Sequence, residues 1–223
     1  MQKKLIITID GPAGAGKSTV SKVLAKELGY LYLDTGALYR ALGYKVLKNK
    51  IALDDISALS ALCFNTNVAL KNIGSQLKVY VDGEDVGDKI RTEEVGLTAS
   101  RISTYAVVRQ SLLQLQREAG APGGVVAEGR DMGSVVFPQA DYKFFLDADI
   151  EERIKRRHRE LRDKGDLSAD WETVKKDMLA RDKQDAERAI APLKPTASSI
   201  IIDSTNLSVG EVVAGIIRRV AGG

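Results

Sequence analysis

The sequence has few of the residues that mark disulfide-rich, collagen-like or membrane-embedded proteins. Its 223 residues include one cysteine, Cys63, so we expect a reducing compartment, the cytoplasm, and a thiol that serves as core filler. Glycine and proline, at 20 and 5 residues, are too few for a collagen-like or low-complexity chain. No apolar run approaches the roughly 18 residues of a membrane-spanning helix, and the apolar stretch after the N-terminal lysines ends at Asp10. The sequence therefore predicts neither a membrane span nor a signal peptide.

Charge of either sign is not in excess. The 33 Lys and Arg side chains and the 30 Asp and Glu side chains leave a net charge of +3 at pH 7. This balance gives no argument for nucleic-acid binding, although it leaves small anionic substrates open. Apolar residues make up 44% of the chain, and a chain of this length buries about 70% of its unfolded surface.

Short apolar runs that alternate with helical patterns predict an α/β fold. Residues 4–9 form a β-branched run with almost no polar residue, which indicates the central strand of a parallel sheet, buried on both faces. Further short strands are expected at 30–33, 125–126, 142–146 and 200–202, separated by helical patterns. We therefore predict a parallel sheet flanked by helices on both faces.

Two segments depart from this alternation. Residues 65–95 alternate apolar and polar positions across turn signals, which predicts a small antiparallel β insert on the main sheet. A basic-rich segment at about 151–168, followed by a helix at 170–188, is interpreted as a short helical lid. The remaining residues, about 1–64, 96–150 and 189–223, are expected to form the core of a single domain without internal repeats.

The strongest motif is a P-loop, Gly11-x-x-x-x-Gly16-Lys17-Ser18, placed between a predicted strand and a predicted helix. Its glycines let backbone N–H groups surround phosphate oxygens, and the helix N-terminus adds partial positive charge. We expect Lys17 to reach the β and γ phosphates of ATP and Ser18 to ligate Mg²⁺. A tight turn without a ligand is the alternative. The predicted ATP-binding residues are Gly11, Pro12, Ala13, Gly14, Ala15, Gly16, Lys17, Ser18 and Thr19.

Two other classes of P-loop protein find little support. The sequence has neither an Asn-Lys-x-Asp motif nor an Asp-x-x-Gly switch after the P-loop, which disfavours a GTPase. The run that ends at Asp147 resembles a Walker B strand, but no glutamate follows to prepare a water for hydrolysis. We interpret Asp147 as a plain strand end.

An apolar helix stripe changes to charged residues in the helix near Trp171. Trp171, Val174 and Met178 advance by three and four residues, and the same spacing leads to Arg181, Asp185 and Arg188. Charges on an inward helix face cost several kcal/mol unless they are paired or bind a charged ligand. We therefore predict that this face lines a cleft. The alternative is an exposed salt-bridge network that includes an Arg181–Asp185 pair.

Arginines recur at the ends of other predicted elements, at Arg40, Arg109 and Arg130. The planar guanidinium suits phosphate and carboxylate recognition. Because ligands of open parallel sheets lie beyond the carboxyl ends of strands, Arg130 is the strongest of these candidates. Asp34 lies at the same edge and is expected to orient Mg²⁺, directly or through water. Its alternative role is the N-cap of the helix that begins at Thr35.

The basic helix of the lid supplies two further candidates, Arg153 and Arg157, which lie one turn apart. A lid that folds over the triphosphate would neutralise charge during transfer and exclude water. The alternative is a solvated helix face. Transfer between phosphates needs no general base, because the acceptor oxygen is already anionic. The predicted catalytic set is Lys17, Arg130, Arg188, Arg153 and Arg157.

Six segments together resemble the bacterial cytidylate (CMP) kinase family over essentially the whole chain. The most selective are Gly-Arg-Asp-Met-Gly at 129–133 and the long β insert, because the P-loop occurs in many kinases. The segments, in chain order, are residues 11–19, 34–40, 90–95, 128–138, 145–148 and 188–193.

The resemblance implies transfer of the γ-phosphoryl group of ATP to CMP or dCMP. It implies that Arg40, Arg130 and Arg188 hold the acceptor phosphate and that Arg181 and Asp185 contact the sugar. The cytosine edge would be read by Thr35, Ser100, Arg109 and Asp131. Some members of the family have serine where this sequence has Thr35. We also expect a monomer without nucleic-acid or membrane partners.

The chemistry of the base agrees with these residue types. Cytosine offers an N4 amino donor to a carboxylate, whereas uracil has the acceptor O4 there, so Asp131 would discriminate against UMP. One alternative is another small-molecule P-loop kinase that acts on UMP, AMP or shikimate. A second is a non-enzymatic ATP-binding module that contacts nucleic acid through the basic helix near Arg156.

Overall fold

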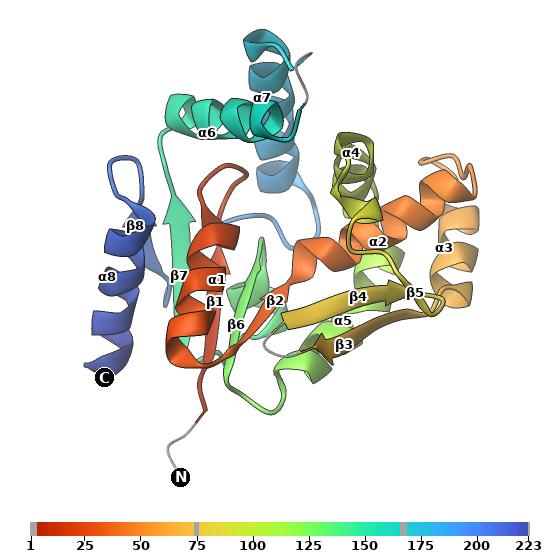
Figure 1. Cartoon of the computed structure of the whole chain (residues 1–223). Helices are drawn as coiled ribbons and strands as arrows, with labels where there is room; N and C mark the ends of the chain where they lie inside the picture. The colour runs from red at the N-terminus through yellow and green to blue at the C-terminus, as the bar shows by residue number, and fades with distance from the viewer. Residues whose placement is uncertain (1–3, 74–75, 166–168, 223) are drawn as a thin grey trace.

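The computed structural model describes residues 4–73, 76–165 and 169–222, which are built around one mixed β-sheet (Figure 1). The parallel strands run in the order β2-β6-β1-β7-β8, so β1 lies in the middle, as predicted. These strands all pair in parallel, which confirms the predicted fold class. Their bounds are β1 (Ile6–Asp10), β2 (Leu31–Asp34), β6 (Val125–Gly129), β7 (Tyr142–Asp147) and β8 (Ile200–Asp203).

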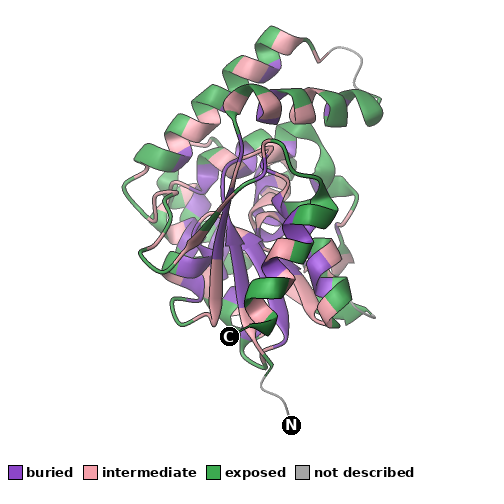
Figure 2. Cartoon of the chain, turned by 90° about the vertical axis from the view of Figure 1, so that its left-hand side faces the viewer, coloured by how far each residue is buried: buried purple, intermediate pink, exposed green. Residues whose placement is uncertain are grey.

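Both faces of the central strands are covered by helices, and these strands are the most buried part of the molecule (Figure 2). On one face, Ile7 of β1 packs in a cluster with Leu24 of α1 (Lys17–Leu28) and Ile216 of α8 (Val209–Ala221). On the other face, Val125 of β6 packs with Val136. A strand covered on both sides has no polar face, which explains the β-branched runs.

The predicted β insert is confirmed as an antiparallel group. Its strands are β3 (Val68–Ile73), β4 (Gln76–Val81) and β5 (Glu84–Asp85). β4 also pairs in parallel with β2 between Gln76 and Tyr32, so the insert extends the main sheet. Residues 74–75 of the insert lie outside the described residues.

Among the described residues, three helices were not predicted from the sequence, in addition to a short 3₁₀ turn. They are α3 (Ile56–Asn65), α4 (Glu93–Ile102) and a short π-helix, η2 (Met132–Val136). The sequence carries start signals for the first two, because Asp55 and Thr92 accept hydrogen bonds from the third residue of their helices. A short 3₁₀ turn at Lys89–Arg91 precedes α4.

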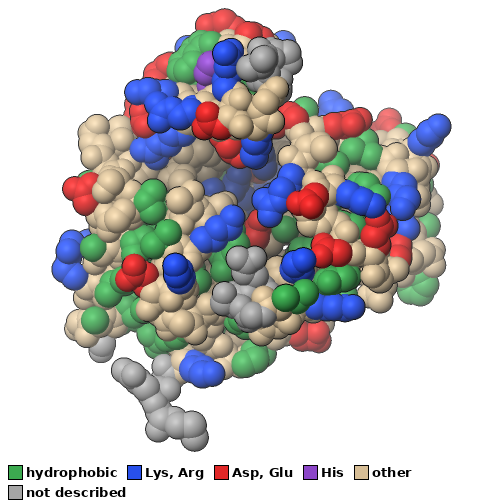
Figure 3. Space-filling view, in the orientation of Figure 1, with side chains coloured by type: hydrophobic (Ala, Val, Ile, Leu, Met, Phe, Trp, Pro, Cys, Tyr) green, Lys and Arg blue, Asp and Glu red, His purple; other side chains and the backbone are tan. Residues whose placement is uncertain are grey.

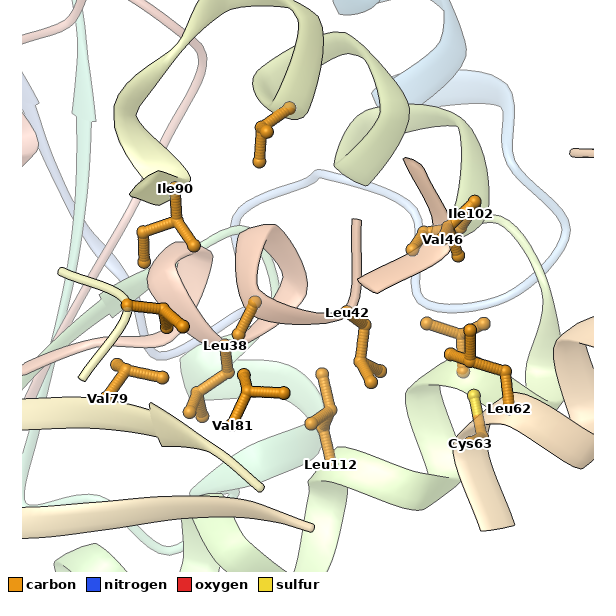
Figure 4. Close-up of a cluster of buried hydrophobic side chains, with 14 of the residues drawn as sticks. Leu38, Leu42, Val46, Leu62, Cys63, Val79, Val81, Ile90, Ile102 and Leu112 are labelled. Atoms are coloured by element: carbon orange, nitrogen blue, oxygen red, sulfur yellow. The ribbon is translucent and has the colours of Figure 1, made fainter. Parts of the chain in front are cut away.

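A separate hydrophobic cluster surrounds α2 (Thr35–Lys48), which lies between the β insert, α3, α4 and α5 (Ala106–Gly120). Cys63 of α3 is buried in this cluster, as predicted for core filler. The side chains that point toward one another in Figure 4 are Leu38, Leu42, Val46, Leu62, Cys63, Val79, Val81, Ile90, Ile102 and Leu112.

Two packed helices lie beyond the carboxyl ends of the strands (Figure 1). α6 (Ile150–Asp163) and α7 (Trp171–Glu187) pack through Ile154, Leu161, Val174 and Met178. α7 ends at Glu187, so Arg188 lies just past the helix rather than within it. Residues 166–168 of the predicted lid lie outside the described residues. No helix in the described ranges is long and apolar enough to cross a membrane.

The cluster around α2 gives a stability prediction. Leu42 is 1% exposed, so we expect Leu42→Ala to lower the free energy of unfolding by about 2–5 kcal/mol through lost burial and a residual cavity. The matched control is Phe64→Ala, because Phe64 is 90% exposed on α3 and should change stability by no more than about 0.5 kcal/mol. Urea denaturation measures both, and equal effects would contradict this assignment of the core.

Candidate functional site

The P-loop connects β1 to α1 and passes beneath α6. Its glycines include Gly14 and Gly16, which have φ angles of 76° and 88°. At Gly14 an added Cβ would lie 2.7 Å from the carbonyl oxygen of Arg153 in α6, so a larger residue would displace the loop or the helix. The N-terminus of α1 begins at Lys17, and its first N–H groups have no intrahelical acceptors. This combination provides a phosphate cradle.

Lys17 is buried at 6% exposure, and its Nζ donates to the carbonyl oxygen of Pro12 at 2.6 Å. Burial lowers the pKa of Lys17 well below its usual value, and the positive charge of Arg130 lowers it further. An isolated buried ammonium is unfavourable unless an anion lies next to it. A bound phosphate would provide that anion and keep Lys17 charged.

Asp10 ends β1 directly before the first P-loop glycine, and sequence reasoning assigned it no role. Its Oδ1 accepts from the Met132 N–H and its Oδ2 from the Gly133 N–H, both at 2.8 Å. Burial raises the pKa of Asp10 to about 6, although the two amide hydrogen bonds act in the opposite direction. Asp10 lies at the same carboxyl edge of the sheet that made Arg130 a candidate. The same argument from strand ends could therefore have identified Asp10 as a site residue.

Glu128 is a second acidic residue without a predicted role, at the carboxyl edge of β6. Its side chain is buried and accepts a hydrogen bond from the Tyr32 hydroxyl. Burial and the neighbouring Asp34 carboxylate raise the pKa of Glu128, whereas Lys17 and a hydrogen bond from Ser18 lower it. Glu128 therefore lies at the junction of the P-loop and β2.

The predicted acceptor residues come together at the carboxyl edge. Arg130 Nε donates to Asp185 Oδ2 at 2.8 Å, and Arg109 forms a buried ion pair with Asp131. Arg188 lies between them, with Nη1 3.7 Å from Asp185 Oδ1 and Nη2 3.9 Å from Asp131 Oδ1. Asp185 is only 3% exposed, so the charged stripe of α7 lines the interior. The alternative of an exposed network is wrong.

Some cationic nitrogens in this cluster lack a hydrogen-bond acceptor. Among the described residues, Arg181 Nε and Arg188 Nη2 are buried cationic nitrogens with no hydrogen-bond acceptor. Burial lowers the pKa of Arg181 to about 10, and the neighbouring Arg130 contributes to the same shift. Figure 3 shows a hollow below the α6–α7 pair, with Lys and Arg side chains on its floor. Unsatisfied buried donors of this kind indicate an anion site.

The remaining predicted contacts surround the cluster. Thr35 Oγ1 donates to the carbonyl oxygen of Glu128 at 2.7 Å. Gln184 Nε2, on α7, donates to the carbonyl oxygen and the Oγ of Ser100 at 2.8 and 3.0 Å. Sequence reasoning missed Gln184, which ties α4 to α7. Ser100 is thereby held against the helix that carries Arg181 and Asp185.

Asp34 takes the alternative role as the N-cap of α2. Its Oδ1 accepts from the Ala37 N–H at 3.0 Å, and its Oδ2 lies 2.7 Å from Arg40 Nη2. In the part of the chain that the structure describes, no group of three or more His, Cys, Asp or Glu side chains is arranged to hold a metal. The role of Asp34 toward Mg²⁺ stays a prediction. Ser18 is exposed at the start of α1.

The two lid arginines make different contacts. Arg153 is buried, and its Nη1 donates to the carbonyl oxygen of Ala13 at 3.2 Å and to Asp182 at 2.6 Å. Arg157 pairs with Glu93 of α4 and, at 2.9 Å, with Glu160. The lid helix is therefore joined to the P-loop by one arginine and to the acceptor side by the other.

The buried Nε of Arg181, which has no hydrogen-bond acceptor, gives a prediction about the free protein. Arg181→Met removes a desolvated charge beside Arg130, so we expect the midpoint of thermal unfolding to rise, by about 2–4 °C per kcal/mol relieved. Sulfate should stabilise the wild type more than this variant, because it supplies the missing partner. The neighbouring control, Lys183→Met, changes an exposed residue. A lower midpoint for Arg181→Met than for this control would contradict the prediction.

Comparison with known proteins agrees with the geometry. The family model described as cytidylate kinase matches residues 7–221. A cytidylate kinase of Geobacillus sp. (strain WCH70) is 49% identical over 220 residues, covering 99% of this chain and 98% of that relative. One from Pasteurella multocida (strain Pm70) is 45% identical over 214 residues, covering 96% of this chain and 94% of that relative.

A solved structure also resembles the chain. It is an uncharacterized protein from Eubacterium ventriosum, with a TM-score of 0.53, 14% sequence identity and coverage of 99% of this chain and 100% of that chain. At this identity the likeness concerns the fold alone. The extent and identity of the family and relative matches carry the assignment, and the chain belongs to the cytidylate kinase family.

Proposed function

We propose that the protein transfers the γ-phosphoryl group of ATP to CMP or dCMP, giving ADP and CDP or dCDP. One observation carries the proposal: buried nitrogens of Arg181 and Arg188 without a hydrogen-bond acceptor lie in the same cluster as Arg130, whose charge acts on the P-loop Lys17. Two anion-binding groups of residues therefore face one shared space. This arrangement suits transfer between a donor and an acceptor phosphate.

The donor side fits ATP as its magnesium complex. The backbone of Gly11, Pro12, Ala13, Gly14, Ala15, Gly16, Lys17, Ser18 and Thr19 forms the cradle, and Lys17 would exchange the Pro12 carbonyl for phosphate oxygen. The hydroxyl of Ser18 is the protein ligand available to Mg²⁺, and Asp34 would act through bound water because Arg40 and the Ala37 N–H already occupy its carboxylate. The ion supplies charge neutralisation on the phosphates.

The acceptor side fits a cytidine monophosphate. Arg40, Arg130 and Arg188 would hold its phosphate, and Arg181 and Asp185 would contact its sugar. The ion pair of Arg109 with Asp131 presents a fixed row of donors and a carboxylate acceptor, which matches the O2, N3 and N4 groups of cytosine. Thr35 and Ser100 would complete this base-reading edge.

The lid would exclude water and neutralise the transferred group. Arg153 would hold α6 on the P-loop, and Arg157 would reach the phosphates from the same helix. This assignment completes the proposed catalytic set with Lys17, Arg130 and Arg188. The division of the chain into a core, a β insert at 65–95 and a lid at 151–168 belongs to the same proposal, as does a cytoplasmic monomer without nucleic-acid or membrane partners.

An assay of ADP release across CMP, dCMP, UMP, AMP, dTMP and shikimate tests the proposal. We expect CMP and dCMP to give the highest kcat/KM, because cytosine is the only pyrimidine base among these acceptors with an amino donor to place opposite Asp131. Lys17→Ala serves as the inactive control and should lose turnover by orders of magnitude. Fastest turnover with UMP, AMP or shikimate would favour the alternative kinase, and ATP binding without any transfer would favour a binding module.

Asp131→Ala tests the base-reading role separately. We expect the ratio of kcat/KM for CMP to kcat/KM for UMP to fall by at least about tenfold, because the carboxylate that accepts from the amino group is lost. The KM for ATP should change little. Asp177→Ala, at an exposed position on α7, is the matched control. An unchanged ratio in Asp131→Ala would show that this residue does not read the base.

A further inference from the structure

Asp10 joins the two halves of the site from one position. It is the last residue of β1, so its backbone continues into Gly11 of the P-loop. Its side chain reaches in the other direction, where its two oxygens hold the N–H groups of Met132 and Gly133. These amides begin η2, directly after Arg130 and Asp131. Asp10 is 7% exposed, and both of its carboxylate oxygens have partners.

The hydrogen bonds of Asp10 take over a task that falls to another residue in most helices. Aspartate is a preferred N-cap, because its carboxylate accepts from the N–H groups of the first helical turn. Asp131 occupies the N-cap position of η2, yet it makes no capping hydrogen bond. The N–H groups of Met132 and Gly133 are already satisfied by Asp10. The carboxylate of Asp131 is therefore available for other partners.

Those partners lie on the acceptor side. Asp131 forms the buried ion pair with Arg109, and its Oδ1 lies 3.9 Å from Arg188 Nη2. Arg109 is oriented in turn by its Nη1 hydrogen bond to the Ser103 carbonyl oxygen at 3.2 Å and by the ring of Tyr39. A move of Asp131 to the capping position would break the Arg109 pair, while Arg188 would keep Asp185 as its neighbouring carboxylate.

We propose that Asp10 is a positioning residue for base recognition, which keeps the Asp131 carboxylate in its pair with Arg109 by capping η2 from the neighbouring strand. The inference rests on the proposed function, in which Asp131 reads the cytosine edge. An acidic residue beside a loop proposed to bind phosphate would otherwise be unfavourable. The role proposed for Asp10 accounts for its presence at the end of β1. The carboxylate faces the protein interior at η2, and the charged groups that act on it are Asp131 and Lys17.

The test is the discrimination between CMP and UMP, measured as the ratio of their kcat/KM values at one ATP concentration. This ratio cancels any effect of Asp10 on the donor site, because both acceptors use the same donor. We expect Asp10→Ala to lower the ratio by about tenfold, since Asp131 becomes the nearest cap for the freed amides. Asp10→Asn retains one acceptor oxygen, so it should fold if the alanine variant does not and should lower the ratio by a smaller factor.

A double-mutant comparison separates positioning from a general loss of stability. If Asp10 acts through Asp131, the variant with both Asp10→Ala and Asp131→Ala should have the same ratio as Asp131→Ala alone. The matched control is Asp55→Ala, which removes the 2.9 Å cap of α3 outside the site. It should lower the unfolding midpoint and leave the ratio unchanged.

The pH profile of the ratio gives an independent readout. Burial places the pKa of Asp10 at about 6, so its second acceptor oxygen is lost as pH falls through this value. We expect the CMP-to-UMP ratio of the wild type to rise with pH through about 6 and that of Asp10→Asn to be flat. The ionisation of the acceptor phosphate is common to both nucleotides and cancels in the ratio.

The outcomes separate the two proposals. If the wild type does not prefer CMP, or if Asp131→Ala keeps the preference, the proposed base reading fails. If Asp131→Ala abolishes the preference while both Asp10 variants keep it, the proposed function stands and the role of Asp10 is overturned. Effects of Asp10→Ala and Asp131→Ala that multiply in the double variant would also overturn it, because the two residues would then act separately.

Discussion

Cationic side chains held away from water at the carboxyl edge of the parallel sheet are the constraint on which the rest of the structure depends. Lys17 is buried against a backbone carbonyl, and the guanidinium groups of Arg181 and Arg188 each keep a buried nitrogen without an acceptor. Removing such charges from water costs several kcal/mol for each ion unless a partner of opposite charge is present. Asp185 offsets part of this cost through Arg130. Phosphate-bearing ligands would supply the rest, so affinity for anions is built into the energetics of the free protein.

The parallel sheet makes this concentration of charge possible. Register places Asp34 beside Glu128 and Asp10 beside Gly129, so the ends of β1, β2 and β6 bring their last residues to one edge. The carboxylates at this edge have structural partners. Asp34 caps α2, Glu128 accepts from Tyr32, and Asp10 caps η2. Asp34 also pairs with Arg40, whereas the hydrogen bonds of Glu128 and Asp10 hold neighbouring segments of the chain in place.

The P-loop and the residue before it are hydrogen-bonded to several neighbouring parts of the site. The carbonyl oxygen of Ala13 accepts from Arg153 of α6, and the Ala15 carbonyl accepts from Ser204 after β8. Asp10, immediately before the loop, holds the segment that carries Arg130 and Asp131. Hydrogen bonds therefore connect the P-loop to α6, to the segment after β8 and, through Asp10, to the start of η2. This continuity gives the site a physical basis for aligning the two substrates.

The sequence by itself determined the features that depend on residues close together in the chain. The P-loop, the antiparallel insert and the buried central strand follow from local spacing, because backbone conformation and burial impose fixed periods. The spacing of apolar and charged residues also predicted which face of α7 points inward. This prediction holds as far as Asp185, because α7 ends before Arg188. The short helices α3 and α4 were missed, although Asp55 and Thr92 mark their starts, because their short apolar patterns did not stand out from the neighbouring loops.

Only the tertiary structure decided which charged groups become partners. Asp185 pairs with Arg130, 55 positions away, rather than with the nearby Arg181 that helical spacing suggested. The caps of η2 come from Asp10, more than a hundred residues earlier in the chain. Such pairs depend on strand order and on the close approach of chain segments across the sheet edge. No local periodicity encodes that order, so the sequence indicated the kinds of side chains at the site, and the fold selected their contacts.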